Sequence, residues 1–317
     1  MEDRKKVSFV VPCYNEEEVI PIYYDTMEGK MQEGMLKDLE YEYVFVDDGS
    51  RDRTLEIIQK LREKDEKVHY VSFSRNFGKE AALLAGLQNA SGNYVVTMDV
   101  DLQDSPELLG EMYQAVVEEG YDQAAARRIS RKGEGKIRSF LSEMFYKVIN
   151  RLSDIEIASG ARDYRFMKRS VVNAILSMSE YNRFSKGIFS WVGFKTKWVE
   201  YENVERSAGA TKWSIWKLFA YAMEGIVAFS TKLLSLASSL GIICCVLSFF
   251  SLIFIVVRAM LYGDPVAGWP SMMCVIILMG GLQLLCTGIL GTYLSKIYLE
   301  TKNRPVYIVR EKDGVEL

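Results

Sequence analysis

Residues 94–101, Tyr-Val-Val-Thr-Met-Asp-Val-Asp, form a short apolar run that ends in two carboxylates separated by one valine. The run Tyr94–Met98 has the length and composition of a buried β-strand. Asp99 and Asp101 follow at the point where the chain would leave the sheet. Ligands of open α/β sheets bind beyond the carboxyl ends of the strands, so this stretch predicts a strand and a candidate site together.

Similar short runs occur earlier in the chain and alternate with amphipathic stretches. The runs are Val7–Val11, Tyr43–Val46 and Val68–Ser72, and helices are expected over Thr54–Lys64 and Lys79–Asn89. This alternation predicts an α/β fold, a Rossmann-like and mainly parallel sheet with helices on both faces.

Polar clusters follow the first two predicted strands as well as the fourth. Tyr14-Asn15-Glu16-Glu17 comes after the first, and Asp47-Asp48-Gly49-Ser50 comes after the second. Asp47 or Asp48 can accept hydrogen bonds from a base edge or a ribose, and the pair after the fourth strand can bind Mg²⁺ or Mn²⁺. Neither a dinucleotide fingerprint after a strand nor a P-loop occurs in the sequence, which excludes those two nucleotide-binding classes.

Two long apolar runs without charge, Leu233–Val257 and Gly268–Ser295, close the chain. At about 1.5 Å of rise per residue, each is long enough to cross a hydrocarbon core of roughly 30 Å. We therefore expect transmembrane helices over residues 233–258 and 268–295. The alternative, two buried helices of a water-soluble domain, is disfavoured because such domains seldom contain charge-free helices of this length.

The distribution of basic residues predicts how the two spans are oriented in the membrane. Basic residues precede the first span and follow the second, whereas the connecting loop holds only Arg258 and Asp264. The positive-inside rule then places both termini in the cytoplasm. The charged start, Met1–Lys6, lacks the pattern of a signal peptide, so the catalytic domain is expected to remain cytoplasmic as well. The basic residues that flank the spans are Lys212, Lys217, Lys232, Lys296, Lys302 and Arg304.

The segment before the first span, Lys212–Thr231, has one polar and one apolar face. It predicts an interfacial helix on the cytoplasmic leaflet, with an ordinary core-packed helix as the alternative. The expected organisation is therefore a catalytic domain over residues 1–210, a juxtamembrane helix over 211–232, the two spans, and a cytoplasmic tail over 296–317.

Composition narrows the function further. The net charge of −3 argues against a nucleic-acid-binding protein, which would carry a basic patch. The five cysteines show no metal-binding spacing and four lie in the apolar runs, so they read as small apolar residues. His69, the single histidine, is expected to be a packed residue of a strand.

Four motifs in this order resemble family 2 glycosyltransferases with a GT-A fold. More closely, the chain resembles the polyprenyl-phosphate glycosyltransferases, namely bactoprenol glucosyltransferases of the GtrB type and dolichol-phosphate mannosyltransferases. The similarity covers nearly the whole chain, including the two C-terminal apolar runs. The motifs are Val10–Glu16, Val46–Ser50, Arg75–Lys79 and Met98–Asp104.

The resemblance implies a role for individual residues of this chain. Asp163, in Gly160–Arg165, corresponds to the proposed catalytic carboxylate. A phosphate monoester is already largely dianionic at neutral pH, so we predict that Asp163 orients the acceptor or the sugar at least as much as it takes a proton. The other implied positions are nucleotide-sugar contacts at Pro12, Tyr14, Glu16, Asp47, Asp48, Asp99, Val100, Gln103 and Arg128, metal ligands at Asp99 and Asp101, and lipid-phosphate or diphosphate contacts at Arg131, Arg206 and Lys212.

The function implied is inverting transfer of a monosaccharide from a nucleotide sugar, UDP-glucose or a related UDP-hexose, to undecaprenyl or dolichyl phosphate. The product would form on the cytoplasmic leaflet of an inner or plasma membrane, and the resemblance implies a homotetramer. Two alternatives remain open, a GDP-mannose-dependent dolichol-phosphate mannosyltransferase and a non-catalytic membrane scaffold. A scaffold would be expected to lose the metal-binding aspartates, yet Asp99 and Asp101 are both present.

Overall fold

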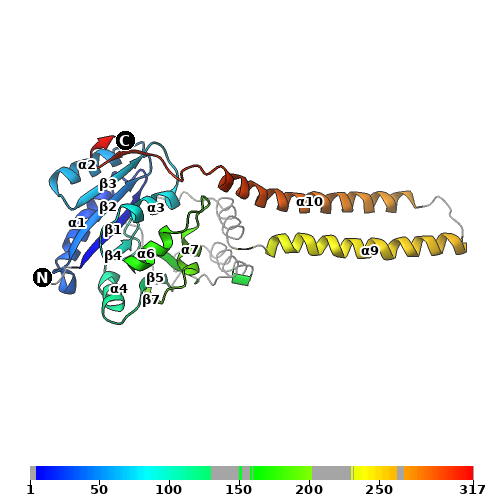
Figure 1. Cartoon of the computed structure of the whole chain (residues 1–317), viewed down its shortest axis with the longest axis horizontal. Coiled ribbons are helices and arrows are strands. Elements are labelled where there is room, and N and C mark those ends of the chain that lie inside the picture. The colour runs from blue at the N-terminus through cyan, green and yellow to red at the C-terminus, as the bar shows by residue number, and fades with distance from the viewer. Residues whose placement is uncertain are drawn as a thin grey trace.

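The computed structural model describes residues 5–129, 150–151, 158, 160–201, 230, 232–262 and 268–316. A sheet covered by helices forms one end of the molecule, and two long helices project from it (Figure 1). The described part of the sheet has nine strands in the order β7-β5-β6-β4-β1-β2-β3-β8-β9.

The centre of the sheet consists of four parallel strands, which the sequence predicted. Strand β1 pairs with β2 on one side and with β4 on the other, and β2 pairs with β3. This arrangement confirms the predicted α/β fold with a parallel core. The four strands are β1 (Lys6–Cys13), β2 (Glu40–Asp47), β3 (Val68–Phe73) and β4 (Tyr94–Thr97).

The outer strands make the sheet mixed. Strand β6 runs antiparallel to both β4 and β5, β5 pairs in parallel with β7, and β8 runs antiparallel to β3. None of these strands was predicted from the sequence. They are β5 (Gln123–Arg128), β6 (Ala161–Lys168), β7 (Thr196–Tyr201), β8 (Val309–Lys312) and β9 (Val315–Glu316).

Helices cover both faces of the sheet because successive residues of the central strands point to opposite sides. Phe9 of β1 packs in one core with Tyr23, whereas its neighbour Val10 packs in another with Leu83. The helices on the Phe9 side are α1 (Ile20–Met31), α2 (Thr54–Lys64) and α4 (Leu108–Val117), with the 3₁₀ helix η1 (Gly34–Leu36). On the other side lie α3 (Lys79–Asn89), α6 (Arg169–Leu176) and α7 (Ser185–Trp191). The predicted bounds of α2 and α3 are confirmed.

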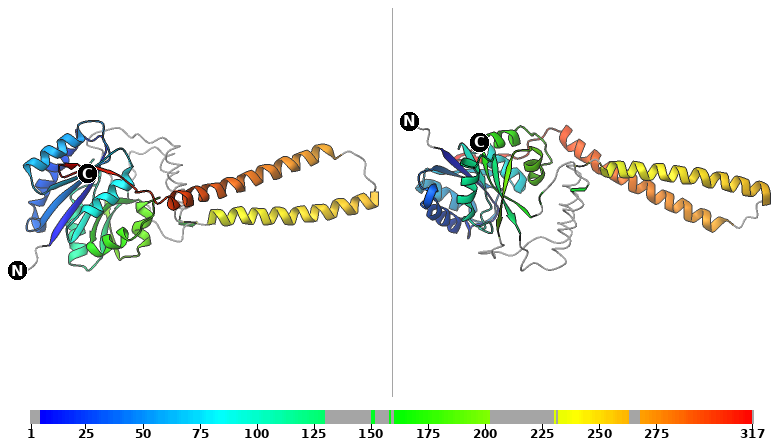
Figure 2. Two further views of the ribbon diagram at one scale, coloured as in Figure 1. Left: turned by 45° about the horizontal axis from the view of Figure 1, so that its top comes forward. Right: turned by 90° about the horizontal axis from the view of Figure 1, so that it is seen from below.

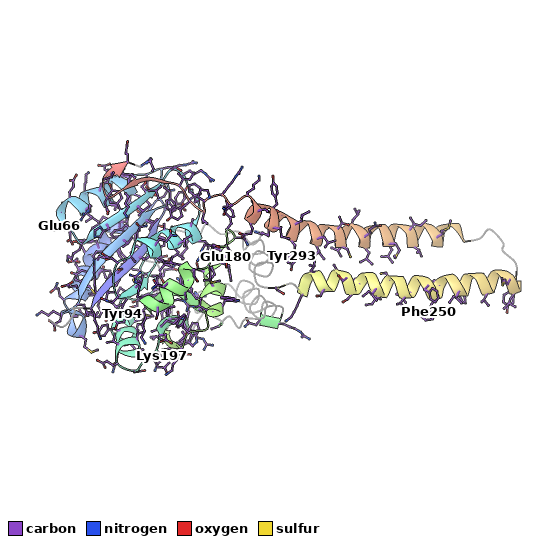
Figure 3. The ribbon with its side chains drawn as sticks, in the orientation of Figure 1. Glu66, Tyr94, Glu180, Lys197, Phe250 and Tyr293 are labelled. Carbon is purple, nitrogen blue, oxygen red and sulfur yellow. The ribbon has the colours of Figure 1, made fainter. Side chains whose placement is uncertain are left out.

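The two predicted apolar helices are present as helices. Helix α9 (Lys232–Tyr262) runs away from the sheet domain, and α10 (Trp269–Thr301) returns beside it in the opposite direction (Figure 2). Large apolar side chains, including Phe250, cover their surface (Figure 3). Among the described residues one segment, Leu278–Thr301, is long and apolar enough to cross a membrane, and Ala237–Ser251 is a shorter apolar helix. The two-span arrangement therefore stays a prediction.

The chain after α10 returns to the sheet domain. Residues 296–301 continue α10, and β8 joins the sheet beside β3, so residues 296–317 are more than the tail that the sequence predicted. Tyr307 stacks on Phe73 of β3 with 4.7 Å between ring centroids. The Asp313 carboxylate accepts a hydrogen bond from the Tyr70 N–H at 2.7 Å. The predicted juxtamembrane helix over 211–232 lies almost wholly outside the described residues.

Candidate active site

The carboxyl edge of the central strands brings two of the predicted acidic residues together. Asp99 follows β4, and Asp163 lies on β6, whose antiparallel register pairs Thr97 with Arg165. The Thr97 hydroxyl donates to the backbone carbonyl of Asp163. The pairing of β6 with β4 thus places the predicted catalytic carboxylate beside the predicted metal-binding one.

A lysine that the sequence analysis did not single out bridges these two carboxylates. The Lys79 ammonium lies 2.8 Å from Asp163 Oδ2 and 2.7 Å from Asp99 Oδ1. Lys79 is the first residue of α3 and the last residue of the Arg75–Lys79 motif. The motif could have pointed to it, but nothing in the sequence indicated that three residues so far apart would meet.

The cluster is held in its charged form. Burial alone would raise the pKa of the Asp163 carboxyl, but the charges of Lys79, Lys186 and Arg162 outweigh burial and lower that pKa well below its usual range. Burial would likewise lower the pKa of the Lys79 ammonium, and the charges of Asp163 and Asp99 raise it instead. Asp163 therefore remains ionised at neutral pH and is a weak proton acceptor, which supports an orienting role.

Asp99 and Asp101 have the chemistry of a divalent-cation site. Burial and the charge of Asp99 raise the pKa of the Asp101 carboxyl, so negative charge is concentrated at this edge. The Asp101 Oδ1 atom accepts a hydrogen bond from the Gln103 N–H at 3.2 Å. No group of three or more His, Cys, Asp or Glu side chains within the described ranges could hold a metal ion. Two carboxylates suit Mg²⁺ or Mn²⁺, since such ions complete their coordination with water and substrate phosphates.

The two aspartates at the end of β2, Asp47 within the strand and Asp48 directly after it, are buried and bonded within the protein. Asp48 accepts hydrogen bonds from the Phe77 N–H at 2.6 Å, the Gly78 N–H at 2.9 Å and the Asn76 side-chain amide at 2.9 Å. Asp47 accepts one from a backbone N–H and one from a serine hydroxyl. Asp48 thereby fixes the turn that precedes α3 and places the bridging lysine. Direct contacts of either aspartate to a nucleotide stay a prediction.

Gly49 allows two of the motifs to lie side by side in the structure. Its φ is +64°, and a Cβ atom at this position would lie 2.4 Å from the carbonyl carbon of Arg75. Only glycine allows this backbone conformation and this close approach without strain. The Val46–Ser50 and Arg75–Lys79 motifs are therefore two segments whose backbones pack directly against each other.

The other predicted nucleotide contacts lie around the same edge of the sheet. Pro12, in β1, is in register with Val46 of β2, and Tyr14 beyond the strand is 40% exposed. The Glu16 N–H donates to the Thr54 hydroxyl at 2.8 Å, which ties this segment to the start of α2. An exposed aromatic ring beside the acidic cluster is suited to stack on a base.

The remaining predicted site residues form three groups: two residues that follow β4, one residue at the end of β5, and three residues that the structure does not describe. Val100 is buried, and Gln103 accepts a long contact of 3.5 Å from Arg162. Arg128 ends β5, with its N–H donating to the carbonyl of Gly160 at 3.0 Å. The lipid-phosphate candidates Arg131, Arg206 and Lys212 lie outside the described residues.

A buried ion pair braces the loop after β4. The Arg162 Nε atom donates to Asp104 Oδ1 at 2.8 Å, and the Tyr201 hydroxyl donates to the same carboxylate. Burial would lower the pKa of Arg162, but the Asp104 charge raises it. Because Arg162 precedes Asp163 on β6, this pair connects the loop that holds the predicted metal ligands with the strand that carries the predicted catalytic carboxylate.

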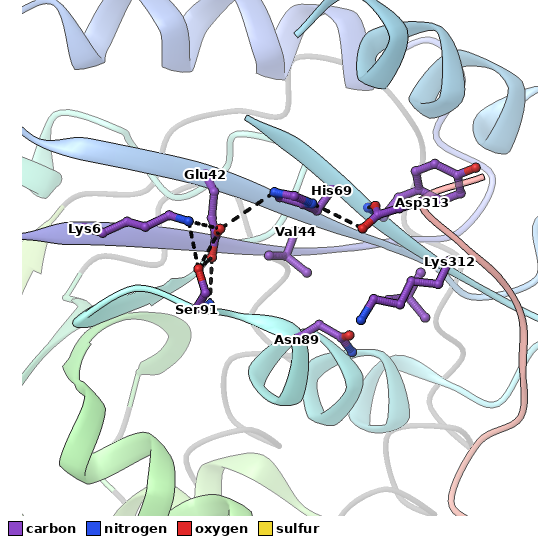
Figure 4. A pocket seen from close by; sticks show the side chains of 10 residues that line it. Lys6, Glu42, Val44, His69, Asn89, Ser91, Lys312 and Asp313 are labelled. Atoms are coloured by element: carbon purple, nitrogen blue, oxygen red, sulfur yellow. Dashed lines mark hydrogen bonds and ion pairs between the residues drawn. The ribbon is translucent and has the colours of Figure 1, made fainter. Parts of the chain in front are cut away.

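A cavity of about 320 Å³ lies at the opposite edge of the sheet, where the central strands begin (Figure 4). Its polar groups bond to one another: the Glu42 carboxylate accepts from the Ser8 hydroxyl at 2.6 Å and the Ser91 N–H at 2.7 Å, and it pairs with the Lys6 ammonium. His69 lies 3.2 Å from Asp313 of the C-terminal segment. These contacts give the cavity a structural role, and the acidic edge remains the candidate active site.

The candidate site is therefore an acidic cluster at the carboxyl edge of a mainly parallel α/β sheet, in which Lys79 bridges Asp99 and Asp163. The model of glycosyl transferase family 2 matches residues 8–176. The chain belongs to this family, which confirms the resemblance seen in the motifs.

Relatives that match nearly the whole chain agree with this assignment. The SfII prophage-derived bactoprenol glucosyl transferase of Shigella flexneri is 44% identical over 309 residues, covering 96% of this chain and 98% of that protein. The putative glycosyltransferase CsbB of Bacillus subtilis (strain 168) is 43% identical, covering 96% of this chain and 91% of that protein. Glucosyl-3-phosphoglycerate synthase from Mycobacterium tuberculosis, solved with Mn²⁺, UDP-glucose and phosphoglyceric acid, has a TM-score of 0.46 and 19% identity and covers 70% of this chain and 78% of its own.

Proposed function

We propose that the protein transfers glucose, with inversion, from UDP-glucose to a polyprenyl phosphate such as undecaprenyl phosphate. The observation that carries this proposal is the meeting of Asp99, Lys79 and Asp163 at the edge of a family 2 domain joined to two long apolar helices. Relatives that match almost the full length, apolar helices included, are named bactoprenol glucosyl transferases, which favours a lipid-phosphate acceptor.

The reaction requires that a phosphate oxygen of the acceptor attack the anomeric carbon while the nucleoside diphosphate leaves from the opposite face. Asp99 and Asp101 would hold Mg²⁺ or Mn²⁺, which when bound supplies positive charge for the diphosphate leaving group. The ionised Asp163 accepts hydrogen bonds from the sugar or orients the acceptor. An acceptor phosphate that is already dianionic needs little help from a general base.

The membrane arrangement is part of the proposal. Helices α9 and α10 would both cross the bilayer, with the catalytic domain and both termini in the cytoplasm. The juxtamembrane helix over 211–232 would lie on the cytoplasmic leaflet. Arg131, Arg206 and Lys212 would hold the lipid phosphate at headgroup depth, since cations there attract phosphate. Assembly as a homotetramer also remains a proposal.

The most useful experiment supplies purified full-length protein with polyprenyl phosphate, Mg²⁺ or Mn²⁺, and a panel of radiolabelled nucleotide sugars. We expect label to enter the lipid fraction fastest from UDP-glucose. Transfer from GDP-mannose alone would select the mannosyltransferase alternative. No transfer from any donor, together with no metal-dependent binding of nucleotide, would identify a non-catalytic scaffold and overturn the proposal.

A further inference from the structure

The C-terminal end of α10 contacts the catalytic domain through two side chains one helical turn apart. The Glu300 carboxylate accepts hydrogen bonds from the N–H groups of Tyr181 at 2.9 Å and Asn182 at 3.3 Å. The Lys296 ammonium donates to the side-chain oxygen of Asn182 at 2.6 Å. A carboxylate and an ammonium on the same face of α10 therefore both bind residues 181–182 of the catalytic domain, and we call this set of hydrogen bonds the grip.

These two side chains are also the first charges after the apolar run of α10, which ends at Ser295. Charged side chains are costly in hydrocarbon, so an α10 that crosses the bilayer is expected to leave the hydrocarbon near Lys296, within the last two turns of the Leu278–Thr301 segment. If α10 crosses the bilayer as proposed, these contacts with residues 181–182 lie at the membrane surface. They would then fix how far above the lipid the attached part of the catalytic domain can lie.

The gripped turn leads directly to the active site. Ser185, three residues after Asn182, begins α7 and donates both its N–H, at 2.8 Å, and its side-chain hydroxyl to the Glu80 carboxylate. Glu80 follows Lys79, whose ammonium contacts Asp163 at 2.8 Å. Side-chain contacts, joined by two short stretches of backbone, thus run from the end of α10 to Asp163.

We propose that Lys296 and Glu300 are positioning residues, which hold the acceptor side of the active site at a fixed height above the membrane by gripping residues 181–182. The inference rests on the proposed function, because only an acceptor that resides in the bilayer would be sensitive to that height. A soluble nucleotide sugar reaches the site from the water and does not depend on the grip.

The test measures transfer by full-length protein in phosphatidylglycerol vesicles that contain polyprenyl phosphate. For Glu300→Ala we expect the KM for polyprenyl phosphate to rise about tenfold, while calorimetric binding of UDP with Mn²⁺ changes less than about twofold. Glu300→Gln keeps one acceptor oxygen and should recover part of the loss. Lys302→Gln is the matched control for the Glu300 variants and should behave as wild type. Lys302 lies two residues beyond Glu300, and its ammonium lies over the Tyr298 ring.

A second measurement tests whether the contacts of α10 with residues 181–182 are energetically coupled to the contact of Ser185 with Glu80. Asn182→Ala removes only the acceptor of Lys296 and should shift the KM in the same direction by about threefold. In a double-mutant cycle, Glu300→Ala and Ser185→Ala should be non-additive, since both loosen the same segment. Additive effects in the cycle would overturn the inference. An unchanged KM in Glu300→Ala, or an equal loss of UDP binding, would also overturn it.

Failure of the inference can be told apart from failure of the proposed function. Wild-type transfer with an unaffected Glu300→Ala variant removes the positioning role and leaves the activity in place. Absence of transfer by the wild-type protein itself removes the proposed function, and the inference falls with it.

Discussion

The positive charge of Lys79 has two opposing effects on the candidate active site. Its ammonium neutralises Asp163 and also competes with any cation that binds Asp99, because both contacts are shorter than 3 Å. The side chain is 43% exposed, so water can replace Asp99 as a partner when a metal arrives. Lys79 is therefore expected to support catalysis while it weakens metal binding.

Replacing Lys79 with methionine separates these two effects. For Lys79→Met we expect the transfer rate to fall by about tenfold or more, because the Asp99–Asp163 pair loses its counter-charge. Mn²⁺ binding in the presence of UDP, measured by calorimetry, should stay the same or tighten. Lys60→Met on α2, where the lysine pairs with Glu56, serves as the control. A loss of both metal binding and transfer would indicate a purely structural role.

The charge state of Asp163 predicts the pH dependence of transfer. Its pKa is lowered in the folded protein, so the carboxylate stays ionised from neutral pH down to below its ordinary value of about 4. Asp163→Asn should therefore reduce the rate by a similar factor at every pH above about 5, without moving the pH profile. An inflection near neutral pH that disappears in the variant would show instead that Asp163 takes a proton. Unchanged turnover at all pH values would remove both roles.

The individual acidic residues could be predicted from sequence, whereas their partners could not. Asp99 and Asp101 stood out because a buried strand ends directly before them. The bridge from Lys79 to Asp163 depends on β6 entering the sheet in antiparallel register beside β4, which no local pattern encodes. In the same way, the aspartates after β2 were expected to face a nucleotide, and their bonds to the protein's own backbone became visible only in the fold.

At the level of helices and strands, prediction succeeded where the hydrophobic pattern was strong. The central strands and helices α2 and α3 have apolar residues at the expected spacing. Strand β5, with the sequence Gln-Ala-Ala-Ala-Arg-Arg, has little β propensity and is held by its neighbours on both sides. Strand β8 is short and charged, and its pairing with β3 depends on residues more than 200 positions away.

Strand β2 carries a buried carboxylate whose ionisation should make the domain sensitive to acid. Burial would raise the pKa of Glu42, but the Lys6 ammonium and the hydrogen bonds from Ser8 and Ser91 lower it from 4.5 to about 2. The ionised form is thus favoured in the folded state. Its stabilisation is complete above the ordinary pKa and is lost as the pH falls from 4.5 to about 2.

Thermal unfolding of the variant Glu42→Gln in detergent tests this expectation. Near neutral pH the variant should be less stable by up to about 3 kcal/mol, at roughly 1.4 kcal/mol per pKa unit, and the difference should shrink as the solution is acidified through this range. Glu40→Gln, an exposed residue of the same strand, should leave the melting temperature unchanged. A difference between Glu42→Gln and wild type that is independent of pH would show that charge is not the cause.

On the scale of the whole molecule, the two long helices determine where the catalytic domain can work. If both cross the membrane, the loop between them emerges on the side opposite the active site. A reporter that functions only in the cytoplasm should be active when fused after Leu317, and one that functions only outside should be active when inserted at Asp264. Activity of the same reporter at both positions would show that α9 and α10 do not form two spans.

The central claim is that the acidic edge of the sheet transfers sugar onto a lipid phosphate. The most direct measurement is the initial rate at which label passes from UDP-glucose to polyprenyl phosphate in vesicles, compared among the wild type, Asp101→Asn and Asp38→Asn. Asp38 is an exposed aspartate of the loop before β2 and serves as the control. We predict a Mn²⁺- or Mg²⁺-dependent rate in the wild type and in Asp38→Asn, and a loss of at least about a hundredfold in Asp101→Asn. A wild-type rate that Asp101→Asn retains in full would contradict the claim.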